Sequence, residues 1–455
     1  MNENAILSHL SHLKQKHLLA GFDRLTQDQK KQFGHQVQKY DRGLLQRQHD
    51  LLFSKPKAGH PFEPIQNYAQ AGSYADRVLG EELVRQGKVA CLILAGGQGS
   101  RLGVDGPKGA VAVSPIKGKS LFQLFSERCR SASMRAGRPL HLAVMTSPLN
   151  HAATKEFFAS HGHFDLPSSH LHFFEQSVLP FCDDRGNWLL ERTGKIAEGP
   201  DGNGNALHLL YQAGLYDQWR SDGVEYVNVI LVDNPLADPF DAELIGYHCR
   251  MHADVVVKAV PRLSANEKMG VVVTSNGKTC VVEYSELSDA DLLAVGADGA
   301  PRFSIANTSQ FSFHIDFIRK IATDRECALP LHLARKQAPV LLATAQGSCI
   351  ELVKVWKFET FIFDLLPFAK RVEVLLYPRG LSYAPLKNAS GEKSLQTVQD
   401  ALLAFDRHIY STLSGLPSPS TPFELHPSFY YPTPDLASRW KAKELPSDSY
   451  VENSE

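Results

Sequence analysis

The sequence has little net charge, few cysteines and no long apolar run, and each of these absences excludes a class of protein. Its 48 lysines and arginines nearly balance 49 aspartates and glutamates, so the formal net charge is -1. A protein that binds nucleic acid regardless of sequence needs a basic surface, which this composition does not supply. We therefore expect no nucleic-acid partner.

The sequence also lacks the marks of a secreted or membrane protein. Its seven cysteines are scattered and contain no Cys-x-x-Cys pair, which favours reduced thiols over disulfides or a zinc site. The N-terminal segment 1–16 has neither a long apolar stretch nor a small-residue cleavage site. No apolar run approaches the about 20 residues that a membrane span requires. We expect a cytoplasmic protein that does not bind a membrane.

What is present is the composition of a globular protein with several domains. A chain of 455 residues with 43% hydrophobic residues predicts two or three domains. Residues 1–88 are predicted to form a helical N-terminal domain, because apolar residues recur at helical spacing and Thr26 with Gln29 fits a capping box. We expect these helices to pack against a larger core, with binding to a partner protein as the alternative. We assign 89–378 to the core domain and 379–455 to a small C-terminal region.

From residue 89 onward, short apolar strands alternate with helical segments. Strands are predicted at 89–95, 140–146, 170–175, 226–232 and 372–377, and helices at 120–136, 205–219 and 394–413. This alternation is typical of an α/β protein whose mostly parallel sheet is covered by helices on both faces. Residues 271–284, with Asn276-Gly277 near their centre, are predicted to form a β-hairpin beside the main sheet.

The strongest motif follows the first predicted strand and reads Leu94-Ala-Gly-Gly-Gln-Gly-Ser-Arg-Leu-Gly-Val-Asp-Gly-Pro-Lys108. Glycines at this place let backbone amides approach phosphate oxygens, and Arg101 and Lys108 add positive charge. The dinucleotide-binding fingerprint requires a glycine where Leu102 stands, and the Walker A motif requires Gly-Lys-Ser/Thr, whereas Pro107 precedes Lys108 here. The segment is therefore predicted to be a phosphate-binding loop of neither type.

Asp233 follows the predicted strand at 226–232. A carboxylate at the carboxyl end of a parallel strand faces the ligand crevice, where it can hold Mg²⁺ against phosphates. The residues alone fit a second interpretation equally well, in which Asp233 caps the next turn, since Asn234-Pro235 is a turn signal.

The glycine-rich segment resembles the LxxGGxGTxLGxxxPK signature of the UDP-sugar pyrophosphorylases, especially the UDP-N-acetylglucosamine pyrophosphorylase family. Further blocks occur in the family's order: Glu175-Gln176, Pro200-Asp-Gly-Asn-Gly204, Val232-Asp-Asn234, Glu283-Tyr-Ser-Glu286, Phe361-Ile-Phe-Asp364 and Pro385-Leu-Lys-Asn388. The resemblance implies a Rossmann-like nucleotidyltransferase core with a mixed, mostly parallel sheet, flanked by a helical N-terminal domain and a small C-terminal domain.

The resemblance also implies a reaction. Members of this family join UTP and a sugar 1-phosphate into a UDP-sugar and release pyrophosphate, so these four molecules are the expected ligands. The implied reaction is a Mg²⁺-dependent in-line displacement that makes UDP-N-acetylglucosamine from N-acetylglucosamine 1-phosphate. A preference for glucose 1-phosphate, and a UDP-sugar-binding protein without turnover, are the alternatives.

Site residues follow from the same resemblance. The implied nucleotide-binding residues are Leu94, Ala95, Gly96, Gly97, Gly99, Gln176, Gly202 and Asn203, and the implied sugar-binding residues are Gly270, Glu283, Asn307, Phe361 and Phe363. Arg101, Lys108 and Lys387 are implied to be catalytic, and Asp233 to be the Mg²⁺ ligand. Without the family, the two phenylalanines fit a plain core and Lys387 a solvated surface. On a strand, Phe361 and Phe363 would face one way, and the family implies that they form the wall that receives an N-acetyl methyl group.

Overall fold

The computed structural model of the chain describes residues 1–54, 62–296, 299–324, 327–344, 347–446 and 449–453. The chain forms two compact units: unit 1 comprises Met1–His60, Gln176–Asn205 and Ala328–Asp364, and unit 2 comprises Pro61–Glu175, Ala206–Cys327 and Leu365–Glu455. The expected domains 1–88, 89–378 and 379–455 are based on changes in residue pattern along the sequence, whereas these units are defined by contacts in space. Each unit is therefore built from segments that are far apart in the sequence.

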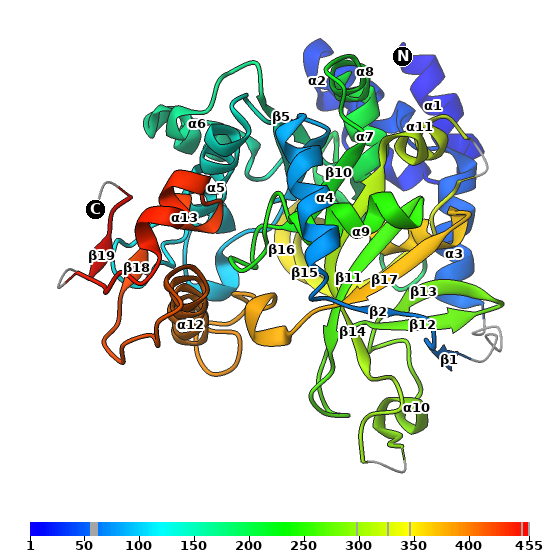
Figure 1. Cartoon of the computed structure of the whole chain (residues 1–455). Coiled ribbons are helices and arrows are strands. Elements are labelled where there is room, and N and C mark those ends of the chain that lie inside the picture. Colours follow the sequence, from blue (N-terminus) through cyan, green and yellow to red (C-terminus); the bar gives the residue numbers. More distant parts are fainter. Residues whose placement is uncertain (55–61, 297–298, 325–326, 345–346, 447–448, 454–455) are drawn as a thin grey trace. The chain divides into compact units, whose positions relative to one another are not determined.

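Unit 2 is built on a mixed sheet with the strand order β2-β17-β11-β14-β10-β3-β4-β5 (Figure 1). In chain order these strands are β2 (Ala69–Gln70), β3 (Val89–Leu94), β4 (Leu142–Thr146), β5 (Leu171–Glu175), β10 (Tyr226–Leu231), β11 (Val255–Pro261), β14 (Ile305–His314) and β17 (Val372–Leu376). Strand β14 is antiparallel to both of its neighbours, and the other pairs along this path are parallel. The predicted α/β fold with a mixed, mostly parallel sheet is confirmed.

The central strands are buried because helices contribute to the same core. Every residue of β3 is buried, as expected for a parallel strand covered on both faces. Its neighbours in the core include residues of four helices, which are α4 (Tyr74–Arg85), α5 (Leu121–Ala136), α6 (His151–Ser160) and α12 (Leu395–Ser414). The hydroxyl of Ser120 accepts a bond from the amide of Gln123 and so caps α5, as predicted.

The remaining helices of unit 2 have at most 10 residues, and a hairpin lies beside the sheet. The helices are α7 (Ala206–Gln212), α8 (Leu215–Ser221), α9 (Ala242–Met251), α10 (Asp289–Leu293), α11 (Ile315–Thr323) and α13 (Pro434–Trp440). The predicted hairpin is confirmed as β12 (Val271–Ser275) and β13 (Lys278–Val282). Asn276 and Gly277 join its strands with φ values of 50° and 72°, the left-handed backbone that a tight hairpin turn requires. Strand β12 pairs with β14 and with β1 (Glu63–Pro64), so the hairpin extends the main sheet.

Unit 1 combines the N-terminal helices with a long β-ribbon. The helices α1 (Glu3–His12), α2 (Gln27–Gln38) and α3 (Arg42–Phe53) share a core with Trp188, Ile196 and Phe358, which confirms that they pack on other parts of the chain. The predicted capping box between Thr26 and Gln29 is confirmed at the start of α2. The ribbon consists of β15 (His332–Thr344) and β16 (Gly347–Glu359), and four short strands accompany it: β6 (Val178–Pro180), β7 (Leu190–Arg192), β8 (Lys195–Ile196) and β9 (Glu198–Pro200).

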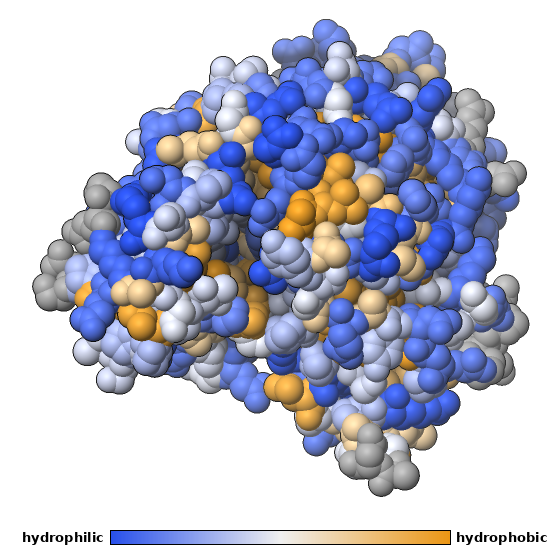
Figure 2. Space-filling model, viewed as in Figure 1, coloured by the Kyte–Doolittle hydropathy of each residue, from blue (hydrophilic) through white to orange (hydrophobic). Residues whose placement is uncertain are grey.

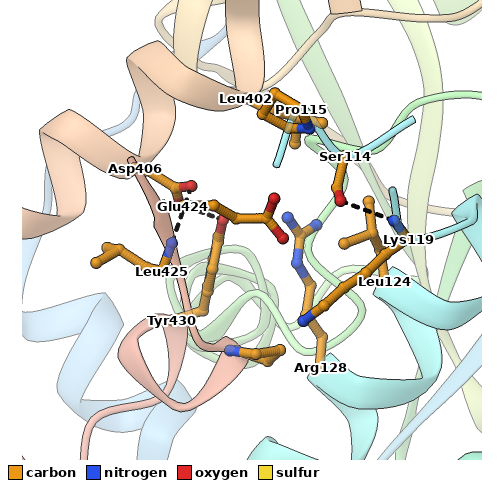
Figure 3. A pocket seen from close by; sticks show the side chains of 11 residues that line it. Ser114, Pro115, Lys119, Leu124, Arg128, Leu402, Asp406, Glu424, Leu425 and Tyr430 are labelled. Atoms are coloured by element: carbon orange, nitrogen blue, oxygen red, sulfur yellow. Dashed lines mark hydrogen bonds between the residues drawn. The ribbon is translucent and has the colours of Figure 1, made fainter. Parts of the chain in front are cut away.

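The C-terminal segment packs on α5 through buried polar groups. A cavity of about 10 Å³ lies where this segment meets α5, lined among others by Arg128, Asp406, Glu424 and Tyr430 (Figure 3). The Asp406 carboxylate accepts bonds from the Leu425 amide at 3.2 Å and the Tyr430 hydroxyl at 2.5 Å. Burial raises the pKa of Asp406 to about 7. The strand pair β18 (Glu424–Leu425) and β19 (Tyr450–Val451) completes this segment.

The surface on the face shown in Figure 2 is mostly hydrophilic, with apolar side chains in small separate patches. Among the described residues, no helix is both long and apolar enough to span a bilayer.

Candidate active site

The glycine loop leaves the carboxyl end of β3 and folds back on itself. The amide of Gly99 donates to the carbonyl of Gly106 at 3.0 Å, and the amide of Lys108 donates to the carbonyl of Gly97 at 3.2 Å. Two short 3-10 helices, η3 (Ser100–Leu102) and η4 (Lys108–Ala110), continue the loop. The fold-back therefore places Lys108 beside the first glycines, although eleven positions separate it from Gly97 in the sequence.

Gly109 and Gly97 lack a side chain for different physical reasons. A Cβ at Gly109 would lie 2.2 Å from the Phe122 ring, so this glycine is required by packing. A Cβ at Gly97 would meet only the Lys108 Cδ, at 3.9 Å, and Gly97 is exposed. The Gly97 amide has no backbone acceptor within the described part of the chain. Gly97 thus leaves open space next to a free amide, as an anion-binding loop requires.

Substituting Gly97 by Ala is expected to weaken UTP use while leaving the fold intact. The φ angle of Gly97 is outside the left-handed region and its Cβ space is open, so the melting temperature should stay within about 2 °C. The added methyl group would block phosphate approach, and kcat/KM for UTP should fall about 10- to 100-fold, since a hydrogen bond to a charged group contributes about 1.5–3 kcal/mol.

Gly380→Ala is the matched control for this substitution. Gly380 also lacks a left-handed φ, and a Cβ there would meet nothing within 4 Å. Equal kinetics for Gly97→Ala and Gly380→Ala would contradict the phosphate-binding assignment of the loop.

Lys108, Asp233 and Lys387 come together at the end of this loop. The Nζ atoms of both lysines lie 3.1 Å from Asp233 Oδ2. Lys108 is brought there by the glycine loop, Asp233 by the turn after β10, and Lys387 by the segment after β17. The side chains of Asp233 and Lys108 are 11% and 13% exposed, and that of Lys387 is 36% exposed. All three therefore form one partly buried charge cluster with a net charge of about +1.

The charges in this cluster shift their pKa values in different directions. Burial raises the pKa of Asp233, but the ammonium groups of Lys387 and Lys108 outweigh burial and bring that pKa below its usual value. Burial lowers the pKa of Lys108, and the carboxylate of Asp233 offsets this only in part, while Lys387 and the exposed Arg101 lower it further. The pKa of Lys387 is raised, chiefly by the Asp233 carboxylate. Asp233 is therefore ionised at neutral pH, and Lys108 loses its proton before Lys387 as the pH rises.

The second oxygen of Asp233 is the feature that fits a metal ion. Asp233 Oδ1 is buried and has no hydrogen-bond partner among the described residues. A buried carboxylate oxygen with its lone pairs unused is a suitable ligand for Mg²⁺, which usually takes one or two carboxylates and completes its shell with phosphates and water. The described residues contain no group of three or more His, Cys, Asp or Glu arranged to hold a metal, so phosphate oxygens would have to supply further ligands.

The turn-capping interpretation of Asp233 does not match its contacts. In the part of the chain that the structure describes, the side-chain partners of Asp233 are the two lysines, and no backbone amide of the following turn donates to it. The next residue, Asn234, provides the polar contacts of this turn instead.

The predicted sugar-side residues of unit 2 are also neighbours. The amide of Asn307 donates to the carbonyl of Gly270 at 2.9 Å. A Cβ at Gly270 would lie 3.1 Å from Glu283 Oε1, so the absence of a side chain there leaves room for the carboxylate. Asn307 is itself buried, and its Oδ1 accepts from the Ser309 amide at 2.9 Å. The fold thus brings Gly270, Glu283 and Asn307 into one group.

In unit 1, the rings of Phe361 and Phe363 come together, although the two residues do not lie on a strand. The segment forms the 3-10 helix η6 (Ile362–Phe368). The amide of Phe361 donates to Asp364 Oδ2 at 3.2 Å, and the next amide donates to Asn203 Oδ1 at 3.0 Å. These bonds hold the start of η6, so the two phenylalanines do not share the face of a strand. The two rings nevertheless stack, with centroids 5.0 Å apart.

Of the other nucleotide-side residues of unit 1, Gly202 lies directly beside this segment. Gly202 forms a bridge with Thr360, and a Cβ on Gly202 would lie 2.2 Å from the Thr360 carbonyl oxygen. Only glycine fits there, since its φ is also +85°. Gln176 is 8% exposed and lies between β5 and β6 in the chain.

Several residues around these groups were missed by the sequence analysis. His332 Nε2 lies 2.9 Å from Asp364 Oδ2, and its ring centroid lies 4.8 Å from that of Phe361. Asn150 Nδ2 donates to the carbonyls of Ala95 and Gly97 and so holds the start of the glycine loop. Asp364 could have been found from the sequence, because it ends the block Phe361-Ile-Phe-Asp364. Asn150 could not, because a single asparagine 55 residues from Ala95 forms no recognisable pattern.

A larger cavity in unit 2 is separate from this cluster. It has a volume of about 740 Å³ and is lined by parts of α4, α9 and α12 together with Ser382. Its lining includes no glycine-loop residue, nor Lys108, Asp233 or Lys387. The candidate active site is therefore identified by its charge cluster and its loop rather than by the volume of a cavity.

Known proteins resemble this chain in sequence and in fold. A sequence profile described as UTP–glucose-1-phosphate uridylyltransferase matches residues 38–427. A probable UDP-N-acetylglucosamine pyrophosphorylase from Dictyostelium discoideum is 30% identical over 399 residues, which are 83% of this chain and 82% of that protein. A human UDP-N-acetylhexosamine pyrophosphorylase-like protein 1 is 36% identical over 326 residues, which are 70% of this chain and 64% of that protein.

A solved structure extends the likeness to nearly the whole chain. The uridine diphosphate N-acetylglucosamine pyrophosphorylase of Trypanosoma brucei superposes with a TM-score of 0.80 at 25% identity, covering 99% of this chain and 98% of that one. The family profile spans well over half of the sequence, and the glycine loop, Asp233 and Lys387 all lie within it. The chain therefore belongs to the UTP–glucose-1-phosphate uridylyltransferase family.

Proposed function

We propose that this protein transfers the uridylyl group of UTP to N-acetylglucosamine 1-phosphate and so makes UDP-N-acetylglucosamine and pyrophosphate. The observation that carries the proposal is the cluster in which Lys108 and Lys387 share one oxygen of Asp233 beside the glycine loop. The names of two relatives, from Dictyostelium discoideum and Trypanosoma brucei, support N-acetylglucosamine as the sugar.

The chemistry needs positioning and charge neutralisation rather than a side-chain nucleophile. An oxygen of the sugar 1-phosphate attacks the α-phosphorus of UTP, the bond from that phosphorus to the β-phosphate oxygen breaks, and pyrophosphate leaves with the electron pair. The attacking phosphate is already an anion at neutral pH. We assign the loop amides, Arg101 and Lys108 to the phosphates of UTP, and Lys387 to the charge that shifts during transfer. Asp233 would hold Mg²⁺ through Oδ1, and the bound ion would add positive charge at the triphosphate oxygens.

One assay tests the proposed function. The purified chain is incubated with Mg²⁺, UTP and N-acetylglucosamine 1-phosphate, and pyrophosphate release is measured together with the UDP-sugar product. A protein that only senses UDP-sugars would bind the product without releasing pyrophosphate. Binding without turnover would replace the proposed function by that alternative.

The sugar preference is a separate prediction. We expect a higher kcat/KM for N-acetylglucosamine 1-phosphate than for glucose 1-phosphate, because the stacked rings of Phe361 and Phe363 offer an apolar wall for a methyl group. One small apolar group discriminates by only ~1–3 kcal/mol, so measurable use of glucose 1-phosphate should remain. Phe361→Ala should narrow the difference between the two sugars. A clear preference for glucose 1-phosphate in the unmodified protein would reverse the assignment.

We place the proposed reaction in the cytoplasm, as expected from the sequence. The thiols of Cys91, Cys129 and Cys182 are buried, and burial raises the pKa of Cys129 to about 12. Such thiols are poor nucleophiles and fit a protein kept in a reducing compartment.

A further inference from the structure

Asn234 is almost completely buried directly beside the charge cluster, with both ends of its amide in use. The residue is only 1% exposed. Nδ2 donates to the carbonyl of Ser382 at 2.8 Å, and Oδ1 accepts from the amide of Ala384 at 2.9 Å. Both partners belong to the segment that leads into Lys387. The amide thus ties two segments of unit 2 that are about 150 positions apart in the sequence.

A third bond continues the same row. The amide of Leu386 donates to the carbonyl of Asp233 at 2.8 Å. Residues 382, 384 and 386 therefore all bond to the turn at 233–234, each through a backbone group, and Lys387 follows directly. The amide of Lys387 itself donates to the Lys393 carbonyl at 2.7 Å, a bond within the same stretch of chain.

We propose that Asn234 is a positioning residue that holds the segment 382–387 against the Asp233 turn and so sets the distance between Asp233 and Lys387; this inference rests on the transfer function proposed above. Without its side chain, two of the three hydrogen bonds that backbone groups of the segment make with the turn are lost. Gln310 Nε2 still donates to the Ser382 carbonyl, at 3.3 Å, but it does not bind Ala384. The segment would then be free to move by a fraction of an ångström or more, and the 3.1 Å contact of Lys387 with Asp233 would loosen.

The alternative is that Asn234 only stabilises its turn, as its position before Pro235 suggested in the sequence. A purely structural asparagine would lower stability without acting through Lys387. The two cases differ in how the substitution of Asn234 combines with the substitution of Lys387, because residues that act through one another are not additive.

Asn228 supplies the matched control. It is also 1% exposed, lies on β10, and donates from Nδ2 to the carbonyl of Pro239 at 3.1 Å. Asn228→Ala therefore removes a buried amide from the strand that leads to the Asp233 turn, and the hydrogen bond that is lost does not involve the segment 382–387.

The kinetic experiment measures kcat and KM for Asn234→Ala and Asn228→Ala, each in the unmodified protein and in Lys387→Ala. We expect Asn234→Ala to lower kcat by about 10²-fold in the unmodified protein, the loss typical of a misplacement near 1 Å, with little change in KM for UTP. In the Lys387→Ala background, it should lower kcat by less than about twofold, since the group it positions is already absent. Asn228→Ala should leave kcat almost unchanged in both. Equal losses from Asn234→Ala in the two backgrounds would overturn the proposal.

Hydrogen exchange provides a readout that does not require activity. The amide of Ala384 loses its acceptor in Asn234→Ala, so exchange in the peptide 382–387 should rise at least about tenfold, while Asn228→Ala should not change it. Unchanged exchange in Asn234→Ala would show that the Asn234 side chain does not hold the segment 382–387. If the unmodified protein releases no pyrophosphate, the proposed function fails, and the exchange result still decides whether Asn234 holds this segment. Asn234→Ser is the milder variant with the same expectation should Asn234→Ala fail to fold.

Discussion

Asp233→Asn is expected to lower kcat for UDP-sugar formation by about 10²–10³-fold, the loss typical of removing one preorganised charge from a transition state. Two effects act together. The neutral amide is a much weaker ligand for Mg²⁺ at the position of Oδ1, whose lone pairs are unused in the structure. It also leaves the ammonium groups of Lys108 and Lys387 next to each other without the carboxylate that both contact at 3.1 Å.

The dependence of the rate on Mg²⁺ concentration separates these two effects. If Asp233 is the metal ligand, the Mg²⁺ concentration that gives the half-maximal rate rises in Asp233→Asn. Lys387→Ala, in contrast, lowers kcat and leaves that Mg²⁺ concentration unchanged. Asp241→Asn is not a suitable control, since the Asp241 carboxylate is paired with the buried Lys258 of β11. Asp217→Asn is preferable, because Asp217 is an exposed residue of α8. Normal turnover of Asp233→Asn at low Mg²⁺ would remove the metal role from this residue.

Lys108→Ala should lower kcat by a similar factor of about 10²–10³. Lys108 lies beside the open space at Gly97 and is 13% exposed, so its charge acts in a partly dry environment where it is screened less than at the surface. Removing it also leaves Asp233 paired with Lys387 alone, which keeps the carboxylate ionised. The loss should therefore appear in kcat more than in stability. Turnover close to that of the unmodified protein would rule out the proposed role.

The pH profile gives an independent test of Lys108. Because burial lowers the pKa of Lys108, its ammonium form is lost at lower pH than in an ordinary lysine. The activity that needs this charge is present below the pKa of Lys108 and declines as the pH rises through it. As the pH is raised, kcat/KM should therefore begin to fall below the usual lysine pKa of about 10.4. Lys108→Arg keeps its charge to higher pH and should move this decline upward, with some loss of rate from the changed geometry. If kcat/KM declines at the same alkaline pH in both proteins, the group that titrates is not Lys108.

Local patterns were enough to predict most of the fold of unit 2. The apolar run at 89–95 became β3 because every one of its side chains is buried in a parallel sheet. The Asn276-Gly277 pair predicted the hairpin because few other residues tolerate the left-handed backbone that the turn needs. Ser120 in unit 2, like Thr26 in unit 1, marked a helix start through a hydrogen bond that spans only three residues. In each case the interaction that decides the structure is local in the chain.

Contacts between distant segments were not predictable in this way. Unit 1 is assembled from three separate segments, and no local signal indicates which of them will share a core. The amides of Phe361 and Ile362 donate to the side chains of Asp364 and Asn203 at the start of a 3-10 helix. Asn203 lies 159 positions from Ile362, so no spacing in the sequence marks this bond.

The sequence by itself determined the strands, the caps and the glycine loop, since these depend on burial periodicity and on bonds between residues a few positions apart. Only the tertiary structure decided that Lys108, 125 residues from Asp233, and Lys387 both pair with one oxygen of Asp233, and that Asn234 bonds to the segment carrying Lys387. Charge interactions and buried amide bonds act over a few ångströms in space, and the sheet, rather than the spacing of residues along the chain, brings their partners within that range.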